Sequence, residues 1–202
     1  MTTTARKPRD GHPWESGRHA RILKVLSGGQ TGVDRAALDA ALSVGIPIGG
    51  WCPRGRRAED GTIPTIYPLR ETPSRDYRER TRWNVRDSDG TLILTPADLG
   101  GGTALTWRMA RRLHRPVFVV DLRDAVADLV RQIDRWAVVH RIRVLNIAGP
   151  RASQQPLVGE QVRALLAAWW IEGTFIKDAN QAPLASCEMS VGASRFLWSG
   201  RN

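Results

Sequence analysis

The sequence predicts an α/β protein, a doubly wound, mostly parallel Rossmann-like sheet with helices on both faces. Short segments rich in β-branched residues alternate with longer segments in which apolar residues recur at helical spacing. The short segments are apolar throughout, which is typical of parallel strands that are buried on both faces. Several of them lead into glycine-rich loops before a helix, as in the ligand-binding members of this fold class.

The first predicted elements are a strand over residues 22–26 and a helix over residues 33–44. A short strand follows over residues 46–48, where Pro47 indicates an edge strand or a brief one. Residues 49–75 are dense in Gly, Pro and Arg, which predicts a long irregular segment.

The rest of the chain continues the alternation. Strands are predicted over residues 90–94, 116–120 and 142–147, and helices over residues 76–87, 103–114, 125–139 and 157–171. We expect one domain over residues 21–173. A basic leader over residues 1–20, disordered or loosely attached, precedes it, and a C-terminal extension over residues 174–202 follows.

The composition limits where the protein can be located in the cell. The 202 residues are 42% hydrophobic, and no apolar run approaches the roughly 20 residues that span a bilayer. The N-terminus has no apolar signal core, and Cys52 and Cys187 are far apart in the sequence. We therefore expect a cytoplasmic protein without a membrane association.

The net charge is +10, and it has two interpretations. A basic surface attracts polyanions. Alternatively, the excess of Arg over Lys reflects the composition of a GC-rich genome. No zinc-finger or RNP pattern is present, so we expect a small anionic ligand rather than a nucleic acid.

The loop after the first strand, SGGQTGVDR, opens a helix. Its glycines allow a close backbone approach, and the helix N-terminus favours a phosphate. The other interpretation is a tight turn with a helix cap, since neither standard nucleotide fingerprint is present. Asp34 either faces the helix dipole or binds a ligand hydroxyl. The candidate binding residues here are Ser27, Gly28, Gly29, Gln30, Thr31, Gly32, Asp34 and Arg35.

Two further loops show the same pattern. The GGGT stretch before the helix over residues 103–114 offers Gly101, Gly102 and Thr103, with Thr103 as a helix cap, a phosphate ligand or both. The loop after residues 142–147 offers Arg151 and Ser153, which either clamp an anion or form a surface turn.

The long irregular segment adds Trp51 and Arg54. Trp51 would stack on a flat ring or anchor its loop in the core. Asn84 shares a helix face with Tyr77, Arg80 and Thr81, which points toward the ligand loops or toward solvent.

The four histidines lie outside these loops, and no hydrolase or metalloprotease motif is present. The sequence thus predicts a binding pocket, with no catalytic residue and no metal ligand.

Six blocks occur together in this chain and resemble one family. They are SGGQTGVDRAALDAA, GGWCPRGRRAEDGTIP, YPLRET, RTRWNVRDSDGTLIL, GGTALT and LNIAGPRAS, within residues 22–171. In their order they resemble the molybdenum cofactor carrier proteins, which belong to a wider group of Rossmann-like domains called SLOG.

The resemblance implies a non-catalytic carrier that binds the molybdenum cofactor (molybdopterin), a phosphorylated pterin, and protects or delivers it. It assigns the phosphate to residues 27–32 and 101–103, and it places residues 51–57 beside the pterin. It also implies a homo-oligomer, a dimer or tetramer, and a molybdoenzyme as client.

The same group contains lysine-decarboxylase-like proteins that release bases from nucleotides. Their motif is PGGxGTxxE, and Thr106 stands here in place of the glutamate. The missing carboxylate removes the expected acid/base group. The alternative function is therefore a SLOG-type nucleotide-binding protein, or a hydrolase of a nucleotide or its derivative with another carboxylate.

Overall fold

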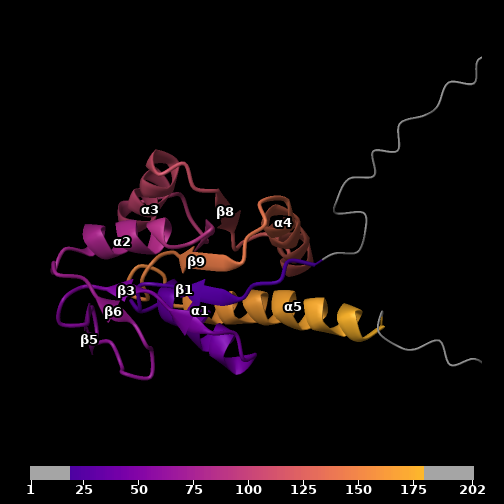
Figure 1. The fold of residues 1–202 in the computed structure, drawn as a ribbon, viewed down its shortest axis with the longest axis horizontal. Coiled ribbons are helices and arrows are strands. Elements are labelled where there is room, and N and C mark those ends of the chain that lie inside the picture. Colours follow the sequence, from indigo (N-terminus) through magenta and orange to yellow (C-terminus); the bar gives the residue numbers. More distant parts are fainter. Residues whose placement is uncertain (1–18, 180–202) are drawn as a thin grey trace, which may run out of the picture.

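A computed structural model describes residues 19–179, with side chains through residue 171. At its centre is a five-stranded parallel sheet in the order β2-β1-β9-β7-β8 (Figure 1). The strands are β1 (Lys24–Leu26), β2 (Ile48–Gly49), β7 (Gly90–Thr95), β8 (Val117–Asp121) and β9 (Val144–Ala148).

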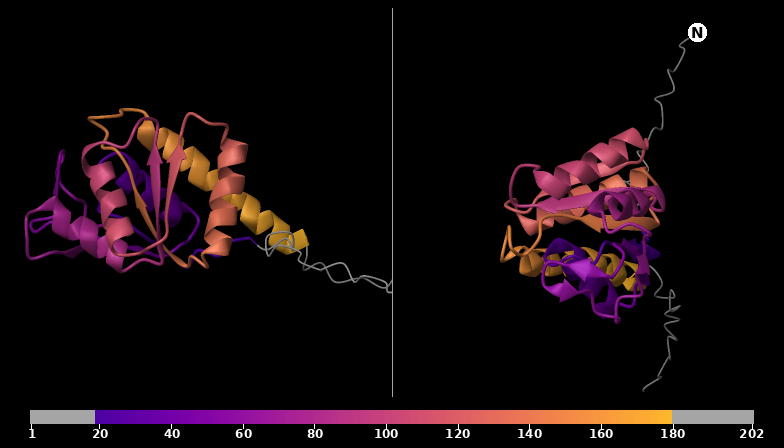
Figure 2. Two further views of the ribbon diagram at one scale, coloured as in Figure 1. Left: turned by 90° about the horizontal axis from the view of Figure 1, so that it is seen from above. Right: turned by 90° about the vertical axis from the view of Figure 1, so that its left-hand side faces the viewer.

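Helices cover both faces of this sheet, as the sequence predicts. They are α1 (Val33–Ser43), α2 (Tyr77–Arg86), α3 (Gly101–Arg112), α4 (Val126–Val139) and α5 (Val158–Ala179). Figures 1 and 2 show α1 and α5 packed together on one side, with α2 and α3 on the other. None of the described helices is long and apolar enough to span a membrane.

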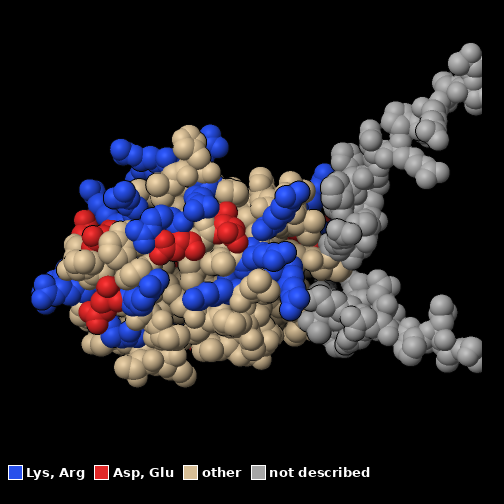
Figure 3. Space-filling model, viewed as in Figure 1, with Lys and Arg blue, Asp and Glu red and all other residues tan. Residues whose placement is uncertain are grey.

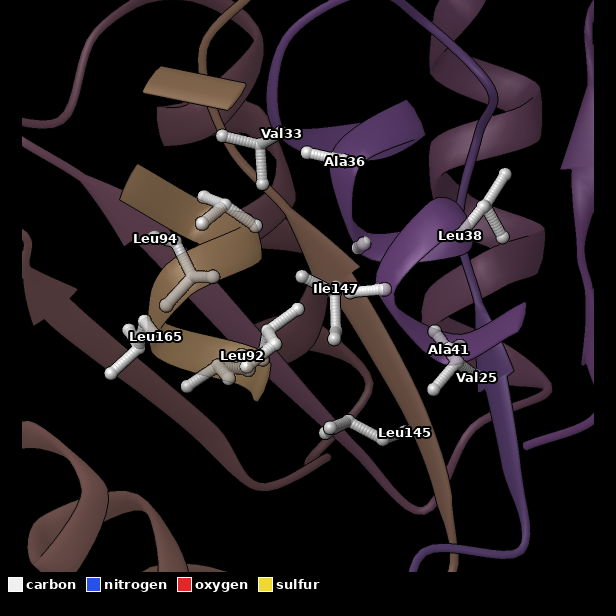
Figure 4. Packing of buried hydrophobic residues seen from close by; sticks show 14 of the residues in the cluster. Val25, Val33, Ala36, Leu38, Ala41, Leu92, Leu94, Leu145, Ile147 and Leu165 are labelled. Atoms are coloured by element: carbon white, nitrogen blue, oxygen red, sulfur yellow. The ribbon is translucent and has the colours of Figure 1, made fainter. Parts of the chain in front are cut away.

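The main core lies between the sheet and α1, α4 and α5. Alternate residues of the central strands face it: Leu92 and Leu94 from β7, and Leu145 and Ile147 from β9. Figure 4 shows these side chains meeting Leu165 and the inner face of α1. The residues between them are buried as well, so both faces of β7 and β9 are covered, which explains the mostly apolar sequence of these strands.

The strand order places the candidate loops together. From β1 the chain moves outward to β2, whereas β7 leads outward to β8 on the other side, and β9 then fills the gap between β1 and β7. The carboxyl ends of β1, β9 and β7 are therefore neighbours. In open α/β sheets, ligands bind at such a reversal of strand order.

The predicted elements are confirmed, with shifts at their ends. The edge position of β2 is confirmed as well. The helix predicted from residue 103 begins at Gly101, where a φ of 48°, which glycine adopts without strain, follows the extended Gly100. Helix α5 continues to Ala179, beyond residue 173. Most of the predicted leader, and residues 180–202, lie outside the described residues.

The prediction that residues 49–75 are irregular is wrong in part. Two small sheets occur there: β3 (Trp51–Cys52) with β6 (Arg70–Glu71) in parallel, and the hairpin of β4 (Arg57–Ala58) with β5 (Gly61–Thr62). Pairs of two residues are too short to leave a periodic pattern in the sequence.

Arg56 organises this segment from within. Its guanidinium donates hydrogen bonds of 2.9–3.0 Å to the backbone carbonyls of Ile63, Pro64, Tyr67 and Leu69. The segment lacks long ladders of its own, so this one side chain satisfies carbonyls that strands would otherwise pair.

Replacing Arg56 by Met should lower the free energy of unfolding by about 2 kcal/mol, since four carbonyls lose a charged donor. Arg54→Met is the matched control, because the Arg54 side chain is exposed and only its backbone N–H is bonded, to Ser74. Urea denaturation and limited proteolysis of both variants would measure the difference. If the two variants are equally stable, the hydrogen bonds of Arg56 do not stabilise this segment.

Candidate anion-binding cavity

A cavity of about 280 Å³ opens at the carboxyl ends of β1, β7 and β9. Four parts of the chain line it: the loop after β1, helix α2, the N-terminus of α3 and the loop after β9. Its lining includes Gln30, Asp34, Tyr77, Arg80, Thr81, Gly101, Gly102, Thr103, Thr106, Gly149, Arg151 and Gln154. The structure therefore brings Gln30, Asp34, Gly101–Thr103 and Arg151, from three separate predicted loops, to one place.

The N-terminus of α3 faces this cavity with its first turn open. Gly100 precedes the helix and provides no side-chain cap, and the first turn contains no acidic residue. A Cβ added at Gly100 or Gly102 would meet no atom within 4 Å. The free N–H groups of a helix N-terminus and its partial positive charge favour an anion at this position.

Two guanidinium groups flank one aromatic ring at the cavity wall. Arg80 of α2 lies 5.9 Å, and Arg151 of the loop after β9 lies 5.1 Å, from the centre of the Tyr77 ring. Arg80 is mostly buried, so its charge is poorly screened. Together with the α3 N-terminus, these groups make the cavity wall electropositive.

Asp34 is the acidic side chain in the described lining of the cavity, and it is 3% exposed. Its Oδ2 accepts hydrogen bonds from Arg80 Nη1 (3.1 Å) and from the Gln30 N–H (3.3 Å). Burial raises the pKa of Asp34 above its usual value, although the charge of Arg80 and these hydrogen bonds oppose the shift. Asp34 thus holds Arg80 in place against the loop after β1.

The Gln30 side chain has a fixed orientation. Its Oε1 accepts hydrogen bonds from the N–H groups of Thr31 (3.0 Å) and Glu59 (2.9 Å), and only an amide oxygen can do this. Its Nε2 is buried and has no partner, and the same is true of Arg80 Nε. Both donors are buried in the wall of the cavity rather than exposed to it.

The glycines of the loop after β1 allow other parts of the chain to pack closely against this loop. A Cβ at Gly28 would lie 1.8 Å from Arg80 Nη1, and one at Gly32 would lie 2.5 Å from the Pro150 carbonyl oxygen. Gly29 and Gly32 also have positive φ values, of 73° and 75°. Ser27 is buried and donates to the Ile147 carbonyl at 2.8 Å. These four residues thus position the cavity, and none of them lies in its lining.

Three other candidates lie beside the cavity, bound to the hairpin of β4 and β5. Thr31 and Ser153 donate to the Glu59 carboxylate. Arg35 pairs with Asp60 through both of its terminal nitrogens. The sequence offers Glu59 only as one of three carboxylates (with Asp34 and Asp60) for the alternative hydrolase, and not as a binding residue, because a carboxylate at the tip of a hairpin gives no sequence signal for ligand binding.

Trp51, Arg54 and Asn84 lie away from this cavity. Asn84 points back at β3, where its amide accepts from the Trp51 N–H (2.8 Å) and donates to the Trp51 carbonyl (3.0 Å). The Trp51 ring lines a separate hollow of about 360 Å³, with Arg70 stacked 4.0 Å from its centre. Of the α2 face singled out in the sequence, Tyr77, Arg80 and Thr81 reach the cavity.

The described residues contain no cluster of His, Cys, Asp and Glu that could hold a metal ion. Cys52 is buried in the core, and burial raises the pKa of its thiol. Basic side chains are scattered over the face shown in Figure 3, with acidic ones between them.

The fold is Rossmann-like and has a cavity at the reversal of strand order, the place where open α/β sheets bind their ligands. Residues 25–170 match the model of the circularly permutated YpsA SLOG family, and the chain belongs to that family.

A similar solved structure is the crystal structure of a protein from Syntrophus aciditrophicus SB named "Putative molybdenum carrier protein". The two chains are 47% identical, with a TM-score of 0.75, and the match covers 76% of this chain and 98% of that one. No curated protein matches the chain.

Removing Arg80 should raise the pKa of Asp34 further, because its charge is the largest influence that lowers it. The folded state would then hold the Asp34 proton more tightly than the unfolded state. The free energy of unfolding of Arg80→Met should therefore fall more steeply than that of the wild type as the pH rises from the ordinary carboxyl range toward neutrality.

Carboxyl-detected NMR titration and urea denaturation over this pH range would measure both effects. Arg78→Met is the control, since Arg78 lies on the same helix but is exposed. A pKa of Asp34 that is the same in both variants would rule out the coupling.

Proposed function

We propose that this protein is a non-catalytic carrier, which binds the molybdenum cofactor or a related phosphorylated pterin in the cavity at the carboxyl edge of the sheet. The observation that carries the proposal is the open N-terminus of α3, facing a cavity whose wall holds Arg80 and Arg151. A phosphate is the group that such a combination of free N–H donors and guanidinium groups binds best.

The residues present fit this cargo. The phosphate would lie on the first turn of α3, where the space above Gly100 and Gly102 is open. The pterin, a flat ring, would lie toward Tyr77, Gln30 and Arg80, which line the cavity and include one ring face. The similarity to the Syntrophus protein supports a molybdenum-containing cargo.

The placement differs from the one that the resemblance implies. Of residues 27–32, Gln30 alone contributes to the cavity lining, and Trp51 and Arg54 do not. We therefore assign the phosphate to residues 101–103, with Arg151 and Arg80, and assign the glycines of the first loop to the packing that shapes the cavity.

Native mass spectrometry with metal analysis tests the function directly. Protein purified gently from cells that make the cofactor should carry a pterin mass together with molybdenum or tungsten. The same spectrum would report whether the carrier is a dimer or tetramer. A bound nucleotide in place of the pterin would move the assignment to the nucleotide-binding branch of the family.

Gly102→Asp and Gly102→Asn form a matched pair at the proposed phosphate position. Both side chains fit the open space above Gly102, and they differ only in charge. The Asp variant should bind the cofactor or inorganic phosphate at least tenfold more weakly than the Asn variant, as expected for one unfavourable charge contact. Isothermal titration of both would measure this, and equal affinities would place the anion elsewhere.

A second candidate function is hydrolysis of a nucleotide derivative, which one observation favours. Asp34 is a buried carboxyl in the cavity, and its raised pKa suits a proton donor. Incubation with nucleoside monophosphates should then release free base, and Asp34→Asn should abolish the release. If the wild type releases no product, the hydrolase function is excluded and the carrier function is the remaining candidate.

A further inference from the structure

Glu59, at the tip of the hairpin of β4 and β5, is held by donors from two other loops. Its Oε1 accepts from the Thr31 hydroxyl and from the Ser153 N–H (3.1 Å), and its Oε2 accepts from the Ser153 hydroxyl (2.5 Å). The Thr31 loop follows β1, and the Ser153 loop follows β9. Three donors thus converge on one carboxylate.

Two hydroxyl groups and a backbone N–H, with a guanidinium group nearby, are the kinds of donor that bind anions in proteins. Burial opposes ionisation of Glu59, but the hydrogen bonds from Ser153 and Thr31, helped by the charge of Arg151, outweigh it and lower the pKa of Glu59. The site therefore favours a negative charge at this position. A phosphate, which has more acceptor oxygens than a carboxylate, suits the same donors.

The donors are arranged without the help of Glu59. The Ala152 N–H donates to Thr31 Oγ at 3.2 Å, and the Val33 N–H donates to the Pro150 carbonyl at 3.2 Å. These two bonds join the loop after β1 to the loop after β9. Removing the Glu59 side chain would leave the site in place.

Glu59 reaches the site on a short and exposed element. Strands β4 and β5 have two residues each, and the side chains of Glu59 and Asp60 are exposed. Apart from the carboxylate, the tip is attached by the Glu59 N–H to Gln30 Oε1 and by the ion pair of Asp60 with Arg35. Exposed contacts of this kind contribute little stability, so this tip can leave its position.

We propose that Thr31, Ser153 and Arg151 form a second phosphate subsite beside the cavity, which the carboxylate of Glu59 occupies until an anionic ligand displaces it. Gln30 and Arg151 adjoin both places, since each also lines the cavity. Apart from Arg151, the subsite uses none of the groups assigned to the phosphate at the N-terminus of α3, so Thr31 and Ser153 remain available whether or not a ligand binds there. A ligand with two phosphate groups would bridge the two.

The test compares two variants that each remove one exposed carboxylate near the carboxyl edge of the sheet. Glu59→Ala frees the donors, whereas Asp98→Ala removes the same charge from the loop before α3. Titration calorimetry with inorganic phosphate should show roughly tenfold tighter binding for Glu59→Ala than for the wild type, as expected when one competing charge-assisted contact is lost. Asp98→Ala should stay within about twofold, the small effect of an exposed charge.

Further variants separate this inference from the proposed function. The gain should persist in the double variant Glu59→Ala with Gly102→Asp, because the second subsite does not use α3. It should disappear when Ser153→Ala is added, since the hydroxyl donor is then lost.

Equal phosphate affinity in Glu59→Ala and Asp98→Ala would overturn the proposal, and so would a gain that survives Ser153→Ala. If circular dichroism shows that Glu59→Ala is unfolded, Glu59→Gln keeps the length of the side chain. Glu59→Gln should still bind phosphate more tightly than the wild type. If its affinity for phosphate equals that of the wild type, the proposal is overturned in the same way.

Discussion

Close backbone contact between the ends of neighbouring strands is the constraint on which the site depends. A Cβ at Gly149 would lie 2.3 Å from the Leu94 carbonyl oxygen, and one at Gly50 would lie 2.2 Å from the Ser27 carbonyl oxygen. A side chain at Gly149 would push the loop after β9 away from β7, and one at Gly50 would push the segment after β2 away from the loop after β1. The donors of these loops converge because no side chain stands between them.

This constraint separates two roles that look alike in a sequence. Glycines that bind a ligand and glycines that allow two loops to touch both occur at the end of a strand. In this protein Gly28 and Gly32 face other parts of the chain, whereas the surroundings of Gly102 are open. The distinction rests on what a Cβ would meet, and that depends on residues more than 40 positions away, such as Arg80 and Pro150.

The sheet, its helices and the edge position of β2 could be predicted, because each follows from local apolar patterns and from Pro47. It could also be predicted from the sequence that Arg151 and residues 101–103 lie near each other, because parallel strands end at the same edge of a sheet. The partners of Trp51 could not be predicted, because an aromatic ring beside arginines suits a ligand and a packed loop equally well. The roles of Arg56 and Glu59 depend on hydrogen bonds across turns that have no periodic pattern.

The pairing of the strands also has a consequence for the order of assembly. Strand β1 pairs with β2 and β9, and β7 pairs with β8 and β9. Among the described strands, the two halves of the sheet are joined only through β9, which follows the other strands in the chain. Before β9 is in place, the inner edges of β1 and β7 have no neighbour, and unpaired edges of this kind can pair with other chains. The cavity, which needs loops from both halves, depends on the insertion of β9 between them.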